Sequence, residues 1–304
     1  MQNYFQAIIP VLIFIFLGYF AKIKKILDVD LARKLIKFLF TIPLPLLVFF
    51  SFATHPVNPR YLTLPLIAII LSSSLMAISY FVGTTLRLTR KRLGTLLVAT
   101  GISSTLLYVL PLVASFYGTD NTKYLFLYDF GNGLLAWTVV YYVAGLFGNK
   151  KSVVIKDTFI TFLKNPMIWA LIGGIVVGLF GLRLPPIIST VTAQLGGFAN
   201  PLLLMCVGIF LDLSFFKSKK HLAHLFIATI LVMGVSYFIV QLLAGIFNLS
   251  GIVYKIVTMC AIAPAGSLTV AFSVEHELDV EFASALVAMT MAVGVLLIPI
   301  LALL

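Results

Sequence analysis

The residues that could most clearly carry a chemical function surround a proline in the middle of a long apolar run. The run extends from about Ile252 to Val274, and residues 261–267 (Ala-Ile-Ala-Pro-Ala-Gly-Ser) lie at its centre. Its length is typical of a membrane-spanning helix. Pro264 has no N–H and clashes with the carbonyl four residues earlier, and Gly266 adds backbone freedom. We therefore expect the helix to break at mid-membrane, where freed backbone groups must be buried in protein or line a watery cavity.

A second segment of the same character lies earlier in the chain. Residues 103–111 combine hydroxyl-bearing side chains with a proline. Two interrupted spans in matching places are typical of the binding site of a secondary transporter. Alternatively, Pro111 and Pro264 mark two ordinary proline kinks, which membrane helices tolerate.

Two helices that both unwind at the midplane would place two half-helix N-termini close together. Each N-terminus carries free N–H groups and the positive end of a helix dipole, and such ends commonly bind anions. No Lys or Arg lies near either break. We therefore expect a carboxylate-bearing organic anion to be held by dipoles and hydroxyls; alternatively, the hydroxyls only join helices to one another. The predicted substrate-binding residues are Ser103, Ser104, Thr105, Tyr108, Pro111, Ala263, Pro264, Ala265, Gly266 and Ser267.

Asp129 is an acid well inside another apolar segment. Burying a charge there costs at least about 2.5 kcal/mol, so an intramembrane acid is a functional candidate. Asp129, Asn132, Gly133 and Ala136 follow helical spacing and should form a small, polar face directed into the protein. We expect Asp129, supported by Asn132, to exchange a proton or help hold a cation. Alternatively, Asp129 is a structural acid hydrogen-bonded to a broken helix.

The remaining polar residues of the apolar segments have simpler interpretations. Asn200 precedes Pro201 and is a candidate support residue, although helix–helix hydrogen bonding is the favoured interpretation. Asp212 is expected to be a solvated acid at a span boundary. The four histidines do not form a cluster with metal-ligand spacing, and no phosphate-binding glycine loop is present. We therefore predict no metal, no cofactor and no ATPase.

The overall composition places the chain in a membrane. Of its 304 residues, 61% are hydrophobic and 10% are charged, with a mean hydropathy of +1.13. No soluble globular domain has this balance, and the strict alternation of a membrane β-barrel is absent. The net charge of +11 lies in short gaps between apolar runs, which indicates membrane topology rather than nucleic-acid binding. Cys206 and Cys260 fall within apolar runs, so we expect no disulfide.

Ten apolar spans fit the chain. They cover roughly residues 4–21, 33–54, 61–86, 93–117, 123–147, 167–182, 186–214, 222–247, 252–275 and 279–303. The first run lacks the basic region and cleavage signal of a signal peptide, and we expect it to be a retained span. Most of the 21 Lys and Arg residues follow the first, third, fifth and seventh spans. By the positive-inside rule, both termini then lie on the non-cytoplasmic side of the cell membrane.

The two halves of the chain resemble each other weakly. Three pairs of segments match in the same order and at similar offsets: 17–20 with 177–180, 45–47 with 201–203, and Pro111 with Pro264. These matches predict a duplicated unit of five spans. Because five is odd, the second unit must be inverted, as in alternating-access transporters. The expected organisation is a first repeat over 1–148, a cytoplasmic linker over 149–166 and a second repeat over 167–304.

Five motifs carry a resemblance to a known family. They are residues 104–112 (family pattern N-T-x-x-x-G-x-P-L), 127–132 (Y-D-x-G-N), 163–166 (K-N-P), 200–211 (P-L-x-L-x-x-x-G) and 264–275 (the Pro-Ala-Gly crossover with an A-x-E-Y end). In their order and spacing, over nearly the whole chain, they resemble the auxin efflux carrier family of membrane transport proteins. That family includes plant auxin exporters and bacterial malonate and malate permeases.

The resemblance implies a fold similar to that of the bile-acid/sodium symporters. The fourth and ninth spans would be broken and would cross at mid-membrane, where an organic anion binds. Spans 1, 2, 6 and 7 would form a scaffold that dimerises, and spans 3–5 and 8–10 an elevator-like transport domain. Two residues depart from the family pattern: Ser104 replaces an Asn, with one donor hydrogen instead of two, and Val109 replaces a Gly. We therefore expect an altered substrate site.

Two other functions compete with transport. Tyr128-Asp129 resembles the first half of an intramembrane aspartyl protease signature, but residues 208–212 have the wrong spacing for the second half, and the Pro-Ala-Leu motif is missing. A non-transporting sensor on the same fold is the other alternative, which Ser104 and Val109 favour. We predict an all-α secondary transporter rather than an enzyme. Export of one negative charge from a negative interior gains about 2.3 kcal/mol per 100 mV, whereas uptake needs a coupled proton or sodium ion.

Overall fold

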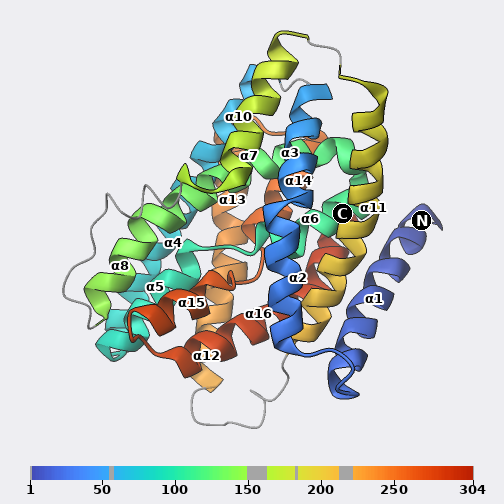
Figure 1. Ribbon diagram of the computed structural model, residues 1–304. Helices are drawn as coiled ribbons and strands as arrows, with labels where there is room; N and C mark the ends of the chain where they lie inside the picture. Colours follow the sequence, from blue (N-terminus) through green and yellow to red (C-terminus); the bar gives the residue numbers. More distant parts are fainter. Residues whose placement is uncertain (1, 55–57, 149–162, 182–183, 212–221, 304) are drawn as a thin grey trace.

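The protein is an all-α membrane protein (Figure 1). The computed structural model describes residues 2–54, 58–148, 163–181, 184–211 and 222–303, and these form helices joined by turns, with one isolated β-bridge. Five helical stretches in the described part of the chain are long and apolar enough to cross a membrane: Val29–Thr54, Pro59–Thr85, Thr119–Phe147, Leu222–Ile246 and Val280–Ile298. Five shorter apolar helices accompany them. The number of spans and the inverted repeat stay predictions.

The helices follow the order of the apolar runs. In the first half they are α1 (Gln2–Ile23), α2 (Val29–Thr41), α3 (Pro43–Thr54), α4 (Leu64–Thr85), α5 (Arg90–Gly101), α6 (Leu110–Tyr117), α7 (Thr122–Leu135) and α8 (Tyr141–Phe147). In the second half they are α10 (Pro166–Leu179), α11 (Pro186–Phe210), α12 (Leu222–Thr229), α13 (Ser236–Ile246), α14 (Gly251–Ala261), α15 (Leu268–Glu275) and α16 (Val280–Leu303). Wider π-helical turns join α7 to α8 and α12 to α13.

Capping residues and prolines explain where several predicted boundaries differ from the observed ones. Asp28 accepts a hydrogen bond from the N–H of Leu31 at 2.7 Å, so α2 begins at Val29 rather than at the predicted residue 33. Pro43 then divides the expected second span into α2 and α3. Most of the expected linker, residues 149–162, and the expected boundary acid Asp212 lie outside the described residues.

Two helix pairs in the structure bring together segments from opposite halves of the chain. Helix α1 packs along α11, and α3 packs along α10. The first pair is very close: a methyl group at Gly18 would lie 2.0 Å from the carbonyl oxygen of Met205, and one at Gly208 would lie 1.9 Å from that of Ile15. Only glycine permits this approach, which is a common way for membrane helices to associate.

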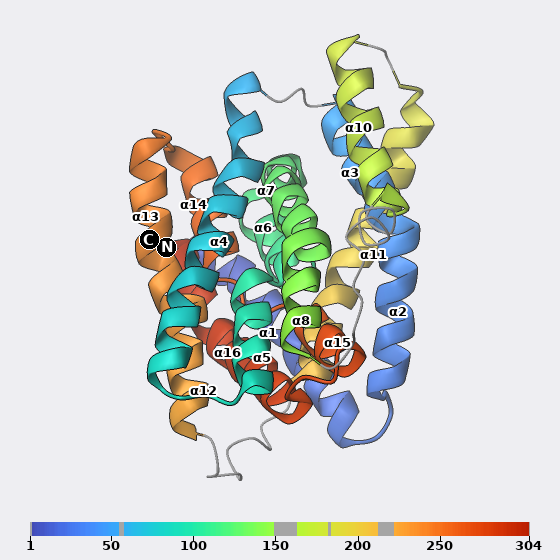
Figure 2. The same ribbon diagram turned by 90° about the vertical axis from the view of Figure 1, so that its left-hand side faces the viewer.

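The other helices form a second group. Helix α4 packs against α5 and α7, α14 packs against α7, and α16 packs against α5 and α12. In Figure 2 the helices α2, α3, α10 and α11 lie on one side of the molecule, and α4, α12, α13 and α14 lie on the other. The largest buried side chains, among them Tyr108, Tyr128 and Phe52, belong to one core that reaches both groups.

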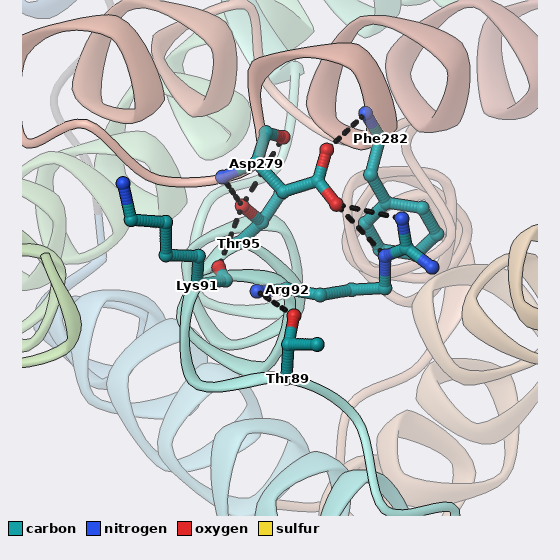
Figure 3. Close-up of polar contacts among 6 residues, drawn as sticks. All are labelled: Thr89, Lys91, Arg92, Thr95, Asp279 and Phe282. Atoms are coloured by element: carbon teal, nitrogen blue, oxygen red, sulfur yellow. Dashed lines mark hydrogen bonds and ion pairs between the residues drawn. The ribbon is translucent and has the colours of Figure 1, made fainter.

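A half-buried ion pair fastens the start of α5 to the start of α16 (Figure 3). The Nε and Nη2 atoms of Arg92 each lie 2.8 Å from Oδ2 of Asp279. Oδ1 of Asp279 accepts the N–H of Phe282 at 3.0 Å and so caps α16, while the N–H of Asp279 donates to Oγ1 of Thr95 at 3.1 Å. One acid therefore joins two helices that are far apart in the sequence.

Candidate functional site

Two interrupted helices meet inside the second helix group. Helix α5 ends at Gly101, and helical structure resumes at Thr105 with a π turn that leads into α6. Helix α14 ends at Ala261, and α15 begins at Leu268. The break predicted around Pro264 is thus present. The other break lies at the start of the segment 103–111 and not at its proline.

The position of Pro111 has a local explanation. The π turn Thr105–Val109 runs directly into α6, and Pro111 lies in the first turn of α6. A proline within a membrane helix is tolerated where a local π turn rearranges the backbone hydrogen bonds that it disturbs. Pro111 is therefore buried within continuous helix, one to two turns beyond the break.

The backbones of the two breaks pair with each other. The N–H of Ser104 donates to the carbonyl of Pro264 at 2.8 Å, and the N–H of Gly266 donates to the carbonyl of Ile102 at 2.8 Å. These bonds form the isolated antiparallel bridge between Ser103 and Ala265. Each break thus satisfies polar backbone groups that the other has freed, which an apolar environment demands. We call this arrangement, formed by residues 102–105 and 262–267, the crossover.

Gly266 allows the two strands of the crossover to approach. A methyl group on Gly266 would lie 2.7 Å from Cγ2 of Ile102 and 3.3 Å from its carbonyl oxygen. A larger residue would therefore push apart the two segments that the hydrogen bond from Gly266 holds together.

A polar cluster supports the crossover from α7. Oδ1 of Asn132 accepts the N–H and the hydroxyl of Ser103, both at 3.3 Å, and Nδ2 of Asn132 donates to the carbonyl of Ser103 at 3.1 Å. The same Nδ2 donates to Oδ1 of Asp129 at 3.3 Å, and this oxygen also accepts the hydroxyl of Thr105. The structure therefore brings together four predicted residues: Ser103, Thr105, Asp129 and Asn132.

Thr290 of α16, which no sequence pattern singled out, supports the crossover from the other side. Its Oγ1 accepts the N–H of Ala265 at 3.2 Å and donates to the carbonyl of Leu286 at 2.8 Å. A single threonine in an apolar span carries no signal of its own. Only the matching place of Asn132 in the other half of the chain could have pointed to it.

The half-helices that start at the crossover present donors without internal partners. Ser104 and Ser267 occupy the N-cap positions, and neither side chain caps its helix. The hydroxyls of Tyr108 and Thr269 are buried and have no hydrogen-bond partner among the described residues. The Tyr108 hydroxyl and Pro264 both lie close to Gly294 of α16. A methyl group on Gly294 would lie 3.2 Å from the Tyr108 hydroxyl oxygen and 3.0 Å from Cγ of Pro264. Buried polar groups are rarely left unpaired, so these donors indicate a bound molecule or water.

A small cavity borders Asp129. Its volume is about 50 Å³. One wall comes from the π turn and α7, and the other from α3 and the start of α10; the lining residues are Val48, Leu106, Phe126, Asp129, Phe130, Gly133, Asn165, Met167, Ile168 and Leu171. The cavity therefore separates the polar cluster from the α3–α10 pair.

Asn200 lies apart from these residues. It is half-buried in α11, a helix that packs against the π turn and α6. It does not belong to the hydrogen-bonded cluster of Ser103, Thr105, Asp129 and Asn132. In the described part of the chain, no group of three or more His, Cys, Asp or Glu residues could hold a metal ion.

Comparisons with known proteins agree with the transporter features of this site. Residues 3–302 match the model of a family described as membrane transport proteins. An uncharacterized transporter of Methanothermobacter thermautotrophicus is 22% identical over 302 residues, which cover 97% of this chain and 96% of the relative. An uncharacterized transporter of Methanocaldococcus jannaschii is 22% identical over 301 residues, 96% of each chain. The chain belongs to the membrane transport protein family, also called the auxin efflux carrier family, and the predicted resemblance is confirmed.

Proposed function

We propose that this protein is a secondary transporter that moves carboxylate-bearing organic anions across the cell membrane, with the anion held at the crossover. The observation that carries the proposal is the pairing of Ser104 with Pro264 and of Gly266 with Ile102. This pairing joins two helix breaks, and each break is followed by an N-terminus that no side chain caps. Such N-termini attract anions through their free N–H groups and their dipoles.

The chemistry around the crossover suits an anion that must also be released. Residues 102–111 and 261–270 contain no Lys or Arg, so no full positive charge would trap the cargo. The buried hydroxyl of Tyr108 supplies a donor that no described residue uses. Ser104 and the fully buried Val109 replace the family Asn and Gly, and both changes reshape the approach to the backbone. We therefore expect the preference among carboxylates to differ from that of family members with the Asn and the Gly.

Helix packing supports an alternating-access mechanism built on an inverted repeat. Helix α1 packs on α11 as α10 packs on α3, and α5 packs on α16 as α14 packs on α7. If each helix of the first half is replaced by its counterpart in the second half, and the reverse, the same pairs of helices result. This symmetry is expected for ten spans in two inverted units. Helices α1–α3, α10 and α11 would form the scaffold, through which two copies pair. Helices α4–α8 and α12–α16 would form the moving domain, with both chain termini on the non-cytoplasmic side.

Flux measurements in proteoliposomes test this function. Radiolabelled malate, malonate and indole-acetate are offered with and without an imposed membrane potential or pH gradient. Wild type is compared with Pro264→Ala, which alters the crossover, and with Pro10→Ala, which replaces an exposed proline inside the continuous helix α1. We expect flux in wild type and Pro10→Ala and its loss in Pro264→Ala. Equal flux in all three proteins would contradict an anion site at the crossover, and no flux of any anion would favour a sensor.

A further inference from the structure

Asp129 links the crossover to the small cavity beside the α3–α10 pair. Its Oδ1 accepts the hydroxyl of Thr105, the first residue of the π turn, and its side chain lines the cavity. A water molecule needs roughly 10–15 Å³ of such space, so the cavity of about 50 Å³ has room for a few waters. Asp129 thus stands between a space that can admit water and the N-terminus proposed to hold the anion.

The donors around Asp129 distinguish a proton from a metal ion. The N–H of Ser103 is a fixed donor, so Oδ1 of Asn132 must accept it, and the NH₂ of Asn132 donates both to the Ser103 carbonyl and to Asp129. An NH₂ group has no lone pair for a metal ion, and sodium or calcium would need several oxygen ligands at this point. The hydroxyl of Thr105 can donate to a carboxylate and can also accept from a carboxylic acid. Asp129 can therefore form a hydrogen bond with Thr105 both as a charged carboxylate and as a neutral carboxylic acid.

No other acid of the described residues lines this cavity. Helices α3 and α10 contribute Val48, Met167, Ile168 and Leu171, and Asn165 completes that wall; none of these side chains titrates. Lys164, next to Asn165, is exposed on the protein surface and does not line the cavity. Tyr128 on α7 and Cys260 on α14 interact electrostatically with Asp129, and both ordinarily titrate above neutral pH. Asp129 is thus the group that changes charge most readily.

The charge of Asp129 and the cargo compete for the same positive helix end. A carboxylate that accepts the Thr105 hydroxyl lies at the N-terminus of the half-helix 105–117, where it neutralises part of the dipole. Protonation of Asp129 removes this competition and the repulsion between two negative groups. Proton binding and anion binding then strengthen each other, as thermodynamic linkage requires.

We propose that Asp129 binds the proton that enters together with the anion, which makes the protein an anion–proton symporter. A proton from the outer side joins a carboxylate oxygen of Asp129, travels with the anion and returns to water inside. This inference rests on the function proposed above and specifies its coupling ion.

Two transport assays and one spectroscopic assay test the inference in the full-length protein. The first assay measures exchange of labelled for unlabelled malonate (or of the anion that gave flux above) without any gradient. The second measures uptake against a one-unit pH gradient with the potential held at zero and with sodium present or absent. Asp129→Asn keeps an acceptor for Thr105 and for Asn132, so the fold should persist. Asp120→Asn, at an exposed acid just before α7, is the matched control.

One coupled proton gives about tenfold accumulation for a one-unit pH gradient, because each pH unit is a factor of ten in proton activity. We expect this accumulation in wild type and Asp120→Asn, without sodium. Asp129→Asn should still exchange malonate, at a rate that the loss of the competing charge changes, but should accumulate none, since an uncharged amide cannot take up and release a proton. Accumulation by Asp129→Asn, or a need for a sodium gradient, would overturn the inference.

Infrared difference spectroscopy separates this inference from the proposed function. A pH jump between 5 and 8 should change a protonated-carboxyl band in wild type and Asp120→Asn but not in Asp129→Asn. If no anion is exchanged by wild type, the proposed function fails for the tested cargo. The band still decides whether Asp129 takes a proton, and its presence in Asp129→Asn or its absence from wild type would refute the inference.

Discussion

Asn132 and Thr290 hold equivalent places on the two sides of the crossover. The side chain of Asn132 accepts the N–H of Ser103 at 3.3 Å, and the side chain of Thr290 accepts the N–H of Ala265 at 3.2 Å. Ser103 and Ala265 are the two residues of the isolated bridge. The N–H groups of these two bridge residues are thus each taken by a side chain, one from α7 and the other from α16.

Removal of the Thr290 hydroxyl should destabilise the protein. In Thr290→Val the N–H of Ala265 would be buried without a partner, which costs about 1–3 kcal/mol. Thr229→Val is the matched control, because its hydroxyl is also buried but serves only the carbonyl of Leu225 within its own helix. Thermal unfolding in detergent should show a clearly lower Tm for Thr290→Val than for Thr229→Val. Equal melting temperatures would mean that the contact with Ala265 contributes nothing.

A methyl group at Gly266 should disrupt the crossover and abolish transport. Gly266→Ala places a carbon 2.7 Å from the side chain of Ile102, and overpacking of this kind costs about 1–3 kcal/mol. At Gly245 in α13 a methyl group meets nothing within 4 Å, so Gly245→Ala should stabilise the helix by up to about 1 kcal/mol. Anion flux and Tm are measured for both variants. Normal flux in Gly266→Ala would show that the crossover tolerates separation.

Loss of the Tyr108 hydroxyl should weaken anion binding without loss of stability. The hydroxyl has no partner among the described residues, so Tyr108→Phe removes a buried polar group that contributes no bond. A hydrogen bond to a charged ligand contributes about 1.5–3 kcal/mol, which corresponds to roughly 10- to 150-fold weaker binding. Tyr254→Phe serves as the contrast, because that hydroxyl donates to Gln241 at 2.5 Å and its loss should lower Tm instead. Unchanged anion affinity in Tyr108→Phe would remove Tyr108 from the site.

Substitution of Ser104 by the family residue should improve the handling of dicarboxylates. Ser104→Asn provides two donor hydrogens in place of one at the crossover. We expect malonate flux to rise relative to indole-acetate flux, with a gain of up to about tenfold for one added bond of about 1.4 kcal/mol. The flux ratio in the same proteoliposome preparation measures the effect. A ratio equal to that of wild type would mean that Ser104 does not contact the carboxylate.

The ion pair of Figure 3 should matter far more than an exposed one. The side chains of Arg92 and Asp279 are only 15% and 19% exposed, whereas those of Arg33 and Asp30 are 67% and 77% exposed. Breaking a fully buried pair costs about 3–5 kcal/mol, and an exposed pair contributes at most about 1 kcal/mol, so this half-buried pair lies between them. Arg92→Met should therefore lower Tm strongly and Arg33→Met should leave it nearly unchanged. Similar melting temperatures for the two variants would show that the α5–α16 contact is dispensable.

Part of the candidate site was predictable from local sequence. A proline and a glycine inside a long apolar run mark a helix break because both act on the backbone near their own position. The i, i+3 spacing of Asp129 and Asn132 predicts a shared helix face in the same local way. These residues do hydrogen-bond to each other, and the break around Pro264 is present. Pro111 was less informative, because the π turn before it accommodates the proline without a break in the helix.

The sequence by itself determined the class of this protein. Its long apolar runs with few charges are suited to burial in a membrane, and the order and spacing of its motifs identify the family. The partners of each break were decided by the tertiary structure alone. Ser104 meets Pro264, Thr290 meets Ala265, and Arg92 meets Asp279 across long stretches of chain. Local propensity and periodicity reach only a few residues along the chain. Which distant groups satisfy a buried donor depends on how whole helices pack, and that packing brings the crossover and Asp129 together.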